Sequence, residues 1–101
     1  MEEKLLYIIN HYGISNQLRK FNEEVFELNE ALIEHEILED CGLFKDSDES
    51  ETRQHIIEEI ADVMVMLEQF KLYYYISSEE ITDIFWKKVD RQLERIKNEN
   101  N

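Results

Sequence analysis

The chain has 101 residues, which suits a single domain over residues 1–101 with one modest core. It contains no Pro and only two Gly, so the turns on which an all-β fold depends are not encoded. Its 24 acidic residues exceed its 11 basic ones, giving a net charge of -13, which argues against binding to the phosphate backbone of DNA or RNA.

The sequence predicts a reduced, cytoplasmic setting. Cys41 is the only cysteine, so the chain forms no internal disulfide and no zinc site built from several cysteines. The first residues do not have the basic leader and apolar run of a signal peptide. No apolar stretch approaches the ~20 residues needed to cross a bilayer, so we expect no membrane partner.

We expect four helices, which cover residues 2–12, 15–39, 52–74 and 78–97. Gly13 ends the first of them. The polar, acidic stretch 41–51 has no periodicity and is expected to be a loop. Ser77, followed three residues later by Glu80, predicts a capping box that opens the last helix. Residues 98–101 are expected to form a frayed tail.

Apolar side chains in three of these helices recur every three or four residues, as in the seams of a helical bundle. The helix over 15–39 carries Leu18, Phe21, Val25, Leu28 and Leu32. The helix over 52–74 carries Ile56, Ile60, Val63, Leu67 and Phe70. The helix over 78–97 carries Ile81, Phe85, Val89, Leu93 and Ile96. We therefore expect an all-α fold resembling a four-helix bundle, in which these seams pack together.

A second stripe runs beside each of the first two seams and carries acidic residues. On the helix over 15–39 it comprises Gln17, Lys20, Glu24, Glu27 and Ala31, roughly 100° around the helix from the seam. On the helix over 52–74 it comprises His55, Glu59, Asp62, Met66, Gln69 and Tyr73. Each stripe holds two carboxylates three residues apart, which places both on one helix face. The two faces are expected to meet when the helices pack antiparallel.

Apolar residues surround Asp62 in the sequence, so we expect its carboxylate to be buried and to need a partner. One interpretation pairs it with a base such as Lys20 or Arg91. The other places a divalent cation among Glu24, Glu27, Glu59 and Asp62. Ligation by oxygen alone favours Mg²⁺, with Mn²⁺ as a possible substitute. The Glu-x-x-His pairs of di-iron bundles are missing, so His11, His35 and His55 are expected to be surface or packing residues.

The helix over 78–97 carries a basic band in an otherwise acidic chain: Lys87, Lys88, Arg91 and Arg95. Three of these residues are spaced so that they share one face. The band is either a solvated face paired with Asp90 and Glu94 or a clamp for phosphate groups. The aromatic side chains of Tyr7, Tyr12 and Trp86 fit core packing better than stacking on a nucleobase.

Two acidic motifs resemble the signature of the MazG-like all-α nucleotide pyrophosphohydrolases, which is EExxE followed by ExxD. They are Glu23-Glu24-Val25-Phe26-Glu27 and Glu59-Ile60-Ala61-Asp62. Gln17, Lys20 and the basic last helix also resemble the family, so the likeness covers about residues 10–97. The pair of motifs is fairly specific, whereas either half alone is weak. The stretch between them is long for the family's pattern.

The resemblance implies a helical, oligomeric, Mg²⁺-dependent enzyme that hydrolyses NTPs or dNTPs to a monophosphate and pyrophosphate, often to remove aberrant nucleotides. It implies a homodimer or homotetramer. The implied metal ligands are Glu24, Glu27, Glu59 and Asp62. The implied substrate contacts are Gln17, Lys20, Lys88 and Arg91. The residue that positions or deprotonates the attacking water is one of Glu23, Glu27 and Glu59. The alternative is a helical interaction module, or one that binds nucleotide without turnover.

Overall fold

The computed structural model describes residues 2–42 and 48–100, and every element in those ranges is helical. The elements are α1 (Glu2–Tyr12), α2 (Ile14–Asp40), α3 (Asp48–Tyr73) and α4 (Ser78–Glu99). The predicted all-α fold is confirmed. None of these helices combines the length and the apolar character that crossing a bilayer requires.

The helix boundaries agree with the predicted ones to within one residue, except at the start of α3 and the end of α4. Gly13 separates α1 from α2 with a φ of 85°, a left-handed conformation that glycine adopts without steric cost. α3 begins at Asp48, so residues 48–51 of the expected loop are helical, while residues 43–47 lie outside the described part. α4 continues through Asn98 and Glu99, two residues of the expected frayed tail, because the helical hydrogen bonding extends to Asn100.

A tight turn sets the direction in which α4 leaves α3. Tyr75 adopts a left-handed φ of 56°, and the Ile76 N–H donates back to the Lys71 carbonyl over 2.8 Å. The predicted capping box is present: the Glu80 N–H donates to the Ser77 hydroxyl (3.1 Å), and the Ser77 N–H donates to the Glu80 carboxylate (2.8 Å). Lys71 also reaches forward to the Ser78 hydroxyl (2.9 Å), which ties the start of α4 to the end of α3.

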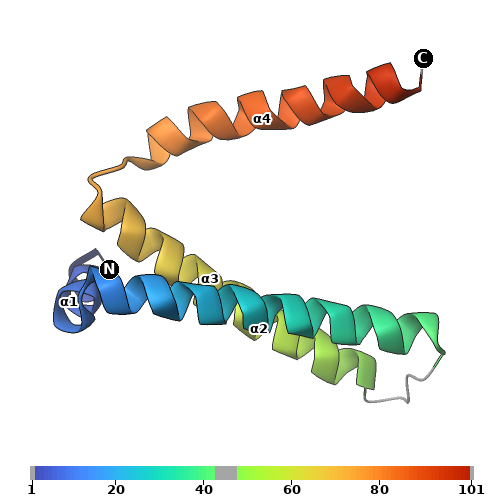
Figure 1. Cartoon of the computed structure of the whole chain (residues 1–101), viewed down its shortest axis with the longest axis horizontal. Helices are drawn as coiled ribbons and strands as arrows, with labels where there is room; N and C mark the ends of the chain where they lie inside the picture. The colour runs from blue at the N-terminus through green and yellow to red at the C-terminus, as the bar shows by residue number, and fades with distance from the viewer. Residues whose placement is uncertain (1, 43–47, 101) are drawn as a thin grey trace.

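The first three helices form one packed unit, and α4 diverges from it (Figure 1). α2 and α3 pack against each other along most of their length, and α1 packs across the end of this pair, mainly on α3. Every described side chain of α4 except Val89 is exposed. The expectation that the seam of the last helix packs against the other two seams is therefore wrong within one chain.

α2 and α3 pack against each other through the second stripe of each helix, the one that carries the acidic residues. Among the described residues the buried apolar side chains are Ile9, Ala31 and Met66, and the buried polar ones are Gln17, Glu24, Thr52, Glu59 and Gln69. Gln17, Glu24 and Ala31 recur every seven residues on α2, which is two turns of a helix.

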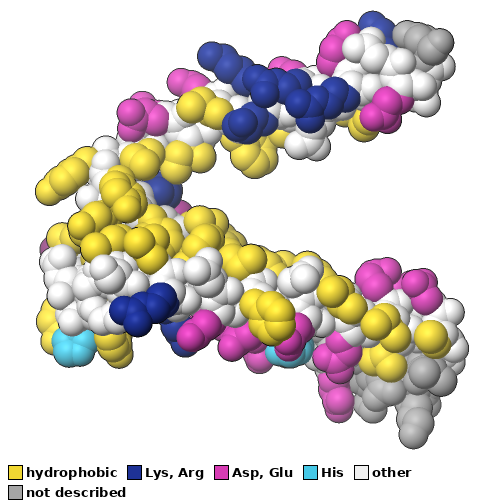
Figure 2. Space-filling model, in the orientation of Figure 1, with side chains coloured by type: hydrophobic (Ala, Val, Ile, Leu, Met, Phe, Trp, Pro, Cys, Tyr) yellow, Lys and Arg dark blue, Asp and Glu magenta, His cyan; other side chains and the backbone are white. Residues whose placement is uncertain are grey.

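The apolar seams lie at the edge of this contact or outside it. Val25 on α2 and Leu67 on α3 are 42% and 45% exposed, although Phe21 and Phe70 still meet edge to face with ring centroids 5.3 Å apart. Figure 2 shows hydrophobic side chains gathered on the side of the α1–α3 unit that is turned toward α4. The sequence patterning thus identified two faces, but the structure buries the polar one between the helices and leaves the apolar one partly uncovered.

Candidate metal centre and adjoining pocket

Three carboxylates from the two central helices converge on one point. Glu24 and Glu27 lie one turn apart on α2, and Glu59 lies on α3. Each offers an oxygen atom, and these atoms all lie within 4.8 Å of one another. Glu24 and Glu59 are buried, with 7% and 9% of their surface exposed, whereas Glu27 faces solvent. The helix packing therefore brings together three of the four predicted metal ligands.

Each of the two buried carboxylates has one oxygen paired with a basic group. The Lys20 ammonium lies 3.1 Å from Glu24 Oε1, and His55 Nε2 lies 3.2 Å from Glu59 Oε1. The second oxygen of each, Glu24 Oε2 and Glu59 Oε2, is enclosed and has no hydrogen-bond partner in the described part of the chain. A buried acceptor without a partner costs free energy, so both oxygens are free to accept a further ligand.

An all-oxygen donor set with two unsatisfied buried carboxylate oxygens fits a hard divalent cation. Such ions take carboxylate ligands and keep open positions for water or phosphate oxygens. Lys20 and His55 neutralise part of the acidic charge, but His55 carries a charge only when protonated. The residues present therefore suit Mg²⁺ or Mn²⁺ better than zinc, for which cysteine and histidine are the usual ligands.

The carboxylates of α2 act on Lys20 electrostatically. The hydrogen bond and charge of Glu24 raise the pKa of the Lys20 ammonium above its ordinary value of 10.5, and the charges of Glu23 and Glu27 act in the same direction. Lys20 is consequently protonated at neutral pH. Its side chain is half exposed, so this ion pair lies at the edge of the site that meets solvent.

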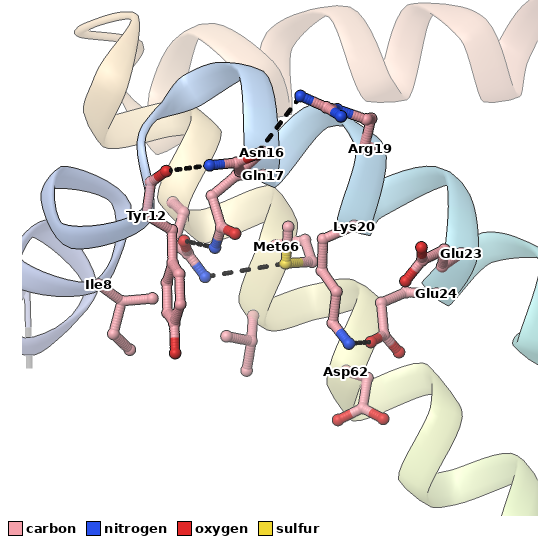
Figure 3. Close-up of a pocket in the computed structure, with 12 residues that line it drawn as sticks. Ile8, Tyr12, Asn16, Gln17, Arg19, Lys20, Glu23, Glu24, Asp62 and Met66 are labelled. Atoms are coloured by element: carbon pink, nitrogen blue, oxygen red, sulfur yellow. Dashed lines mark hydrogen bonds and ion pairs between the residues drawn. The ribbon is translucent and has the colours of Figure 1, made fainter.

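Asp62 lies apart from the three converging carboxylates. It is exposed, so the expectation that its apolar neighbours in the sequence would bury it is wrong. The reason is that several of those neighbours are themselves exposed: Ile60, Met64 and Leu67 are 42%, 57% and 45% exposed. Figure 3 shows Asp62 below the Lys20–Glu24 pair, on the same side of the helices. The predicted pairing of Asp62 with Lys20 is replaced by the Lys20–Glu24 ion pair.

A pocket of about 610 Å³ opens beside the Lys20–Glu24 pair (Figure 3). All three helices of the packed unit contribute to its wall. The wall includes Gln17, Lys20, Glu23, Glu24 and Asp62, which are five of the predicted site residues. It also includes side chains to which the sequence assigns no site role: Ile8, Asn16, Arg19, Val65, Met66 and Gln69.

Tyr12 lines the pocket and is exposed, so it does not serve core packing as expected. Tyr7 and Trp86 are exposed as well, and the same correction applies to them.

Lys88 and Arg91 lie on α4, where both are exposed. Figure 2 shows the basic side chains of α4 clustered on the diverging helix. They do not line the pocket, so the structure does not bring the predicted phosphate clamp to the carboxylates of the same chain.

The three histidines have different surroundings. His11 stacks on Tyr7 and meets Tyr12 edge to face, as expected for a surface residue. His35 hydrogen-bonds the Thr52 hydroxyl (2.8 Å) and helps join α2 to α3. His55 belongs to the carboxylate site through Glu59, although the sequence patterning predicts only a surface or packing role for it. The signal that points to this contact is its spacing of four residues ahead of Glu59 on one helix.

No protein-family model matches the chain, and neither a curated protein nor a solved structure matches it.

Proposed function

We propose that the protein is a Mg²⁺-dependent nucleotide pyrophosphohydrolase that converts an NTP or dNTP and water into the monophosphate and pyrophosphate. The observation that carries the proposal is the pair of enclosed, unpartnered oxygens on Glu24 and Glu59 beside a 610 Å³ pocket. The two acidic motifs that resemble the MazG-like enzymes supply the same residues. The lone, exposed Cys41 thiol suits a cytoplasmic role in removing unwanted nucleotides.

Glu24, Glu27 and Glu59 would hold the cation. Asp62 is outside this cluster but lines the same pocket as Glu24, and it would contribute a fourth carboxylate by turning toward the cation. When bound, Mg²⁺ neutralises charge on phosphate oxygens and lowers the pKa of a coordinated water. Mn²⁺ would serve as a substitute.

The chain's own residues supply positioning and charge. Lys20 contacts a phosphate oxygen after leaving Glu24, and Gln17 contacts the substrate deeper in the pocket. One of Glu23, Glu27 and Glu59 orients the attacking water and accepts its proton. Glu23 lines the pocket and has no basic partner in the described residues, so it is the strongest of the three on geometry.

A second copy of the chain completes the molecule in this proposal, as a homodimer or homotetramer. Two features support it. The apolar seams of α2 and α3 are largely uncovered, and α4 exposes Ile81, Phe85 and Leu93. The cations of α4, among them Lys88 and Arg91, are separated from the acidic site of their own chain. Packing α4 on the seams of a partner would bury apolar surface and bring these cations to the partner's phosphate groups.

The exposed apolar faces also favour a second candidate, a helical interaction module that does not turn over nucleotide. In that case the carboxylates take no part in catalysis. Asp62→Asn would then leave function and stability unchanged, because an exposed carboxylate contributes little by itself.

The experiment that separates the two is a screen of nucleotides with Mg²⁺ and direct detection of pyrophosphate. We expect pyrophosphate release from at least one NTP or dNTP, and its loss with EDTA, in Glu59→Gln and in Asp62→Asn. Glu58→Gln is the matched control, because Glu58 is the exposed neighbour of Glu59 on α3. Release of orthophosphate alone, or activity that survives in Glu59→Gln, would contradict the proposal.

A further inference from the structure

Three side chains in the pocket wall, from α2 and α3, are joined by a series of hydrogen bonds. Gln17 Nε2 donates to Gln69 Oε1 over 2.8 Å, and Gln69 Nε2 donates to the Met66 sulfur over 3.9 Å. The dashed lines in Figure 3 trace both contacts. We propose that Met66 and Gln69 hold the Gln17 amide in one orientation, so that its oxygen selects nucleobases with a ring N–H. This inference rests on the proposed function, because it concerns the base of the same nucleotide.

The sulfur of Met66, at the end of this series of hydrogen bonds, decides which amide group donates and which accepts. A thioether sulfur has no hydrogen and acts only as an acceptor, while an amide NH₂ acts only as a donor. Gln69 therefore turns its NH₂ group toward Met66 and its oxygen toward Gln17. Gln17 must therefore donate to the Gln69 oxygen from its own NH₂ group. Reversing both amides would set the Gln69 oxygen against the sulfur, two acceptors in contact.

Burial makes that orientation costly to reverse. Gln69 is 1% exposed and Met66 is 4% exposed, so water is not at hand to satisfy a flipped amide. A buried polar group that loses its partner is penalised by its full desolvation. Gln69 and Met66 are thus positioning residues, which act on a ligand through Gln17.

The oxygen of Gln17 is the group left to face the pocket. It accepts no hydrogen bond from the described residues, and it is not among the enclosed, unpartnered oxygens, which belong to Glu24 and Glu59. Gln17 lines the pocket seven residues before Glu24, about 10 Å along the axis of α2. A nucleotide with its phosphates at the carboxylates would span this distance with its sugar and place its base near Gln17 and Tyr12.

A single fixed acceptor divides the common bases into two classes. Uracil, thymine, guanine and hypoxanthine carry a hydrogen on a ring nitrogen of their pairing edge, and that N–H donates to the Gln17 oxygen. Cytosine and adenine carry an unprotonated ring nitrogen at that place, which meets the oxygen as a second acceptor. A site built to bond an N–H discriminates against an analogue that lacks it, because its own polar group is left unpaired.

The test compares two substrate pairs, ITP with ATP and UTP with CTP. Within each pair the ring size is constant, a ring N–H is exchanged for a ring acceptor, and the neighbouring carbonyl is exchanged for an amino group. We expect kcat/KM of the wild type to favour ITP over ATP and UTP over CTP by about tenfold or more. Ratios near one, or reversed in both pairs, would overturn the inference without any variant.

Three variants then test the positioning role. Gln69→Met removes the amide and should bring both ratios close to one. Met66→Leu removes the sulfur acceptor at similar volume and should lower them by about threefold, since the sulfur contact is weak. Met64→Leu makes the same change at an exposed position of α3 and should leave them unchanged. General damage to the fold would lower all four kcat/KM values together, so unaltered ratios in Gln69→Met would overturn the inference.

The outcomes distinguish this inference from the proposed function. If the wild type neither hydrolyses nor binds these four or any other NTP or dNTP of the wider screen with Mg²⁺, the proposed function is wrong and the inference fails with it. If it acts on other nucleotides but on none of these four, the proposed function stands and the inference is refuted. If pyrophosphate is released but the base ratios are near one or reversed, the proposed function stands and only the role of the Gln17–Gln69–Met66 chain is refuted.

Discussion

The α2–α3 pair has a polar face buried between its two helices and an apolar face that is partly exposed, the reverse of what hydrophobicity predicts. Here the inner face is the one that α2 and α3 bury against each other, and the outer face is the one that carries their apolar seams. The inner face buries Gln17, Glu24, Glu59 and Gln69, while much of the outer face is apolar and accessible. A monomer that folded for stability alone would do the opposite, because burial of apolar surface is the main driving force of folding. This difference supports the two proposals made above, that the inner face binds a ligand and that the outer face packs on a second copy of the chain.

The largest effect is expected when a charge is removed from the inner face. If Glu59 is a metal ligand as proposed, we expect Glu59→Gln to lower kcat/KM for pyrophosphate release by about a hundredfold or more, because the variant loses the negative charge that holds the cation. The same change should leave the metal-free protein equally stable or more stable, because a partly unsatisfied buried charge is removed. Steady-state kinetics and thermal melts in EDTA measure the two effects. A melting temperature in EDTA that is much lower for Glu59→Gln than for the wild type would mean that Glu59 stabilises the fold, and would contradict this expectation.

The next change places a charge on the outer face. Leu67 belongs to the apolar seam of α3 and is 45% exposed in the single chain. Leu67→Glu should weaken self-association by about a hundredfold, as expected when a charge enters the apolar core of an interface. Light scattering after size-exclusion chromatography measures the mass. Leu67→Met is the control and should keep the wild-type mass. A wild type that is monomeric at high concentration would contradict the proposal that the outer face packs on a second copy of the chain.

A smaller effect is expected where the inner face meets solvent. Lys20→Met removes the partner of Glu24 Oε1 and should destabilise the metal-free protein by about 1 kcal/mol or less, because the ammonium is half exposed. Added Mg²⁺ should shrink the difference, since the cation replaces the lost charge. Denaturant unfolding with and without Mg²⁺ measures both quantities. Lys4→Met, on the exposed surface of α1, is the matched control.

The pH dependence of the same pair has a defined sign. Glu24 raises the pKa of Lys20 above 10.5, so the folded protein holds this proton more tightly than the unfolded chain does. The contribution of the pair is therefore complete at neutral pH, up to the unfolded value. It is lost as the pH rises through the raised pKa. A difference between wild type and Lys20→Met that stays constant far into the alkaline range would contradict this account.

The smallest effect is expected at the turn that leads to α4, outside both faces. Ser77→Ala removes one half of the capping box and should speed amide exchange in the first turn of α4 about fivefold. Hydrogen bonds from the Ser77 backbone and hydroxyl lower the pKa of Glu80 below its ordinary 4.5. The contribution of Glu80 is thus present above that value and lost as the pH falls through the lowered pKa. NMR exchange rates at several pH values measure this, and equal rates in wild type and Ser77→Ala would contradict it.

Much of the fold follows from the sequence because its signals are local. Gly13 and the Ser77–Glu80 box mark helix boundaries by their own backbone chemistry, and both are found where expected. The end of the loop after α2 is an exception. Residues 48–51 are polar and carry no apolar periodicity, yet they extend α3 by a turn, because helix propensity does not require an apolar face.

The carboxylate site was predictable in part for a different reason. The spacing of Glu24, Glu27 and Glu59 fixes the faces on which they lie, and antiparallel packing then brings them together. Asp62 shows the limit of this reasoning. Apolar neighbours in the sequence predict burial only when their own face is covered, and the outer face is not. The position of Lys88 and Arg91 depends on the path of α4, which no spacing within α4 encodes.

Cation binding at Glu24 and Glu59 is measured by titrating the metal-free protein with Mn²⁺ and following the titration by calorimetry or by the spin resonance of the free ion. If the enclosed oxygens of Glu24 and Glu59 await a cation, the wild type will bind Mn²⁺, Mg²⁺ will compete for the site, and Glu24→Gln combined with Glu59→Gln will abolish binding. Binding that is equally strong in this double variant would place the cation elsewhere and contradict the account.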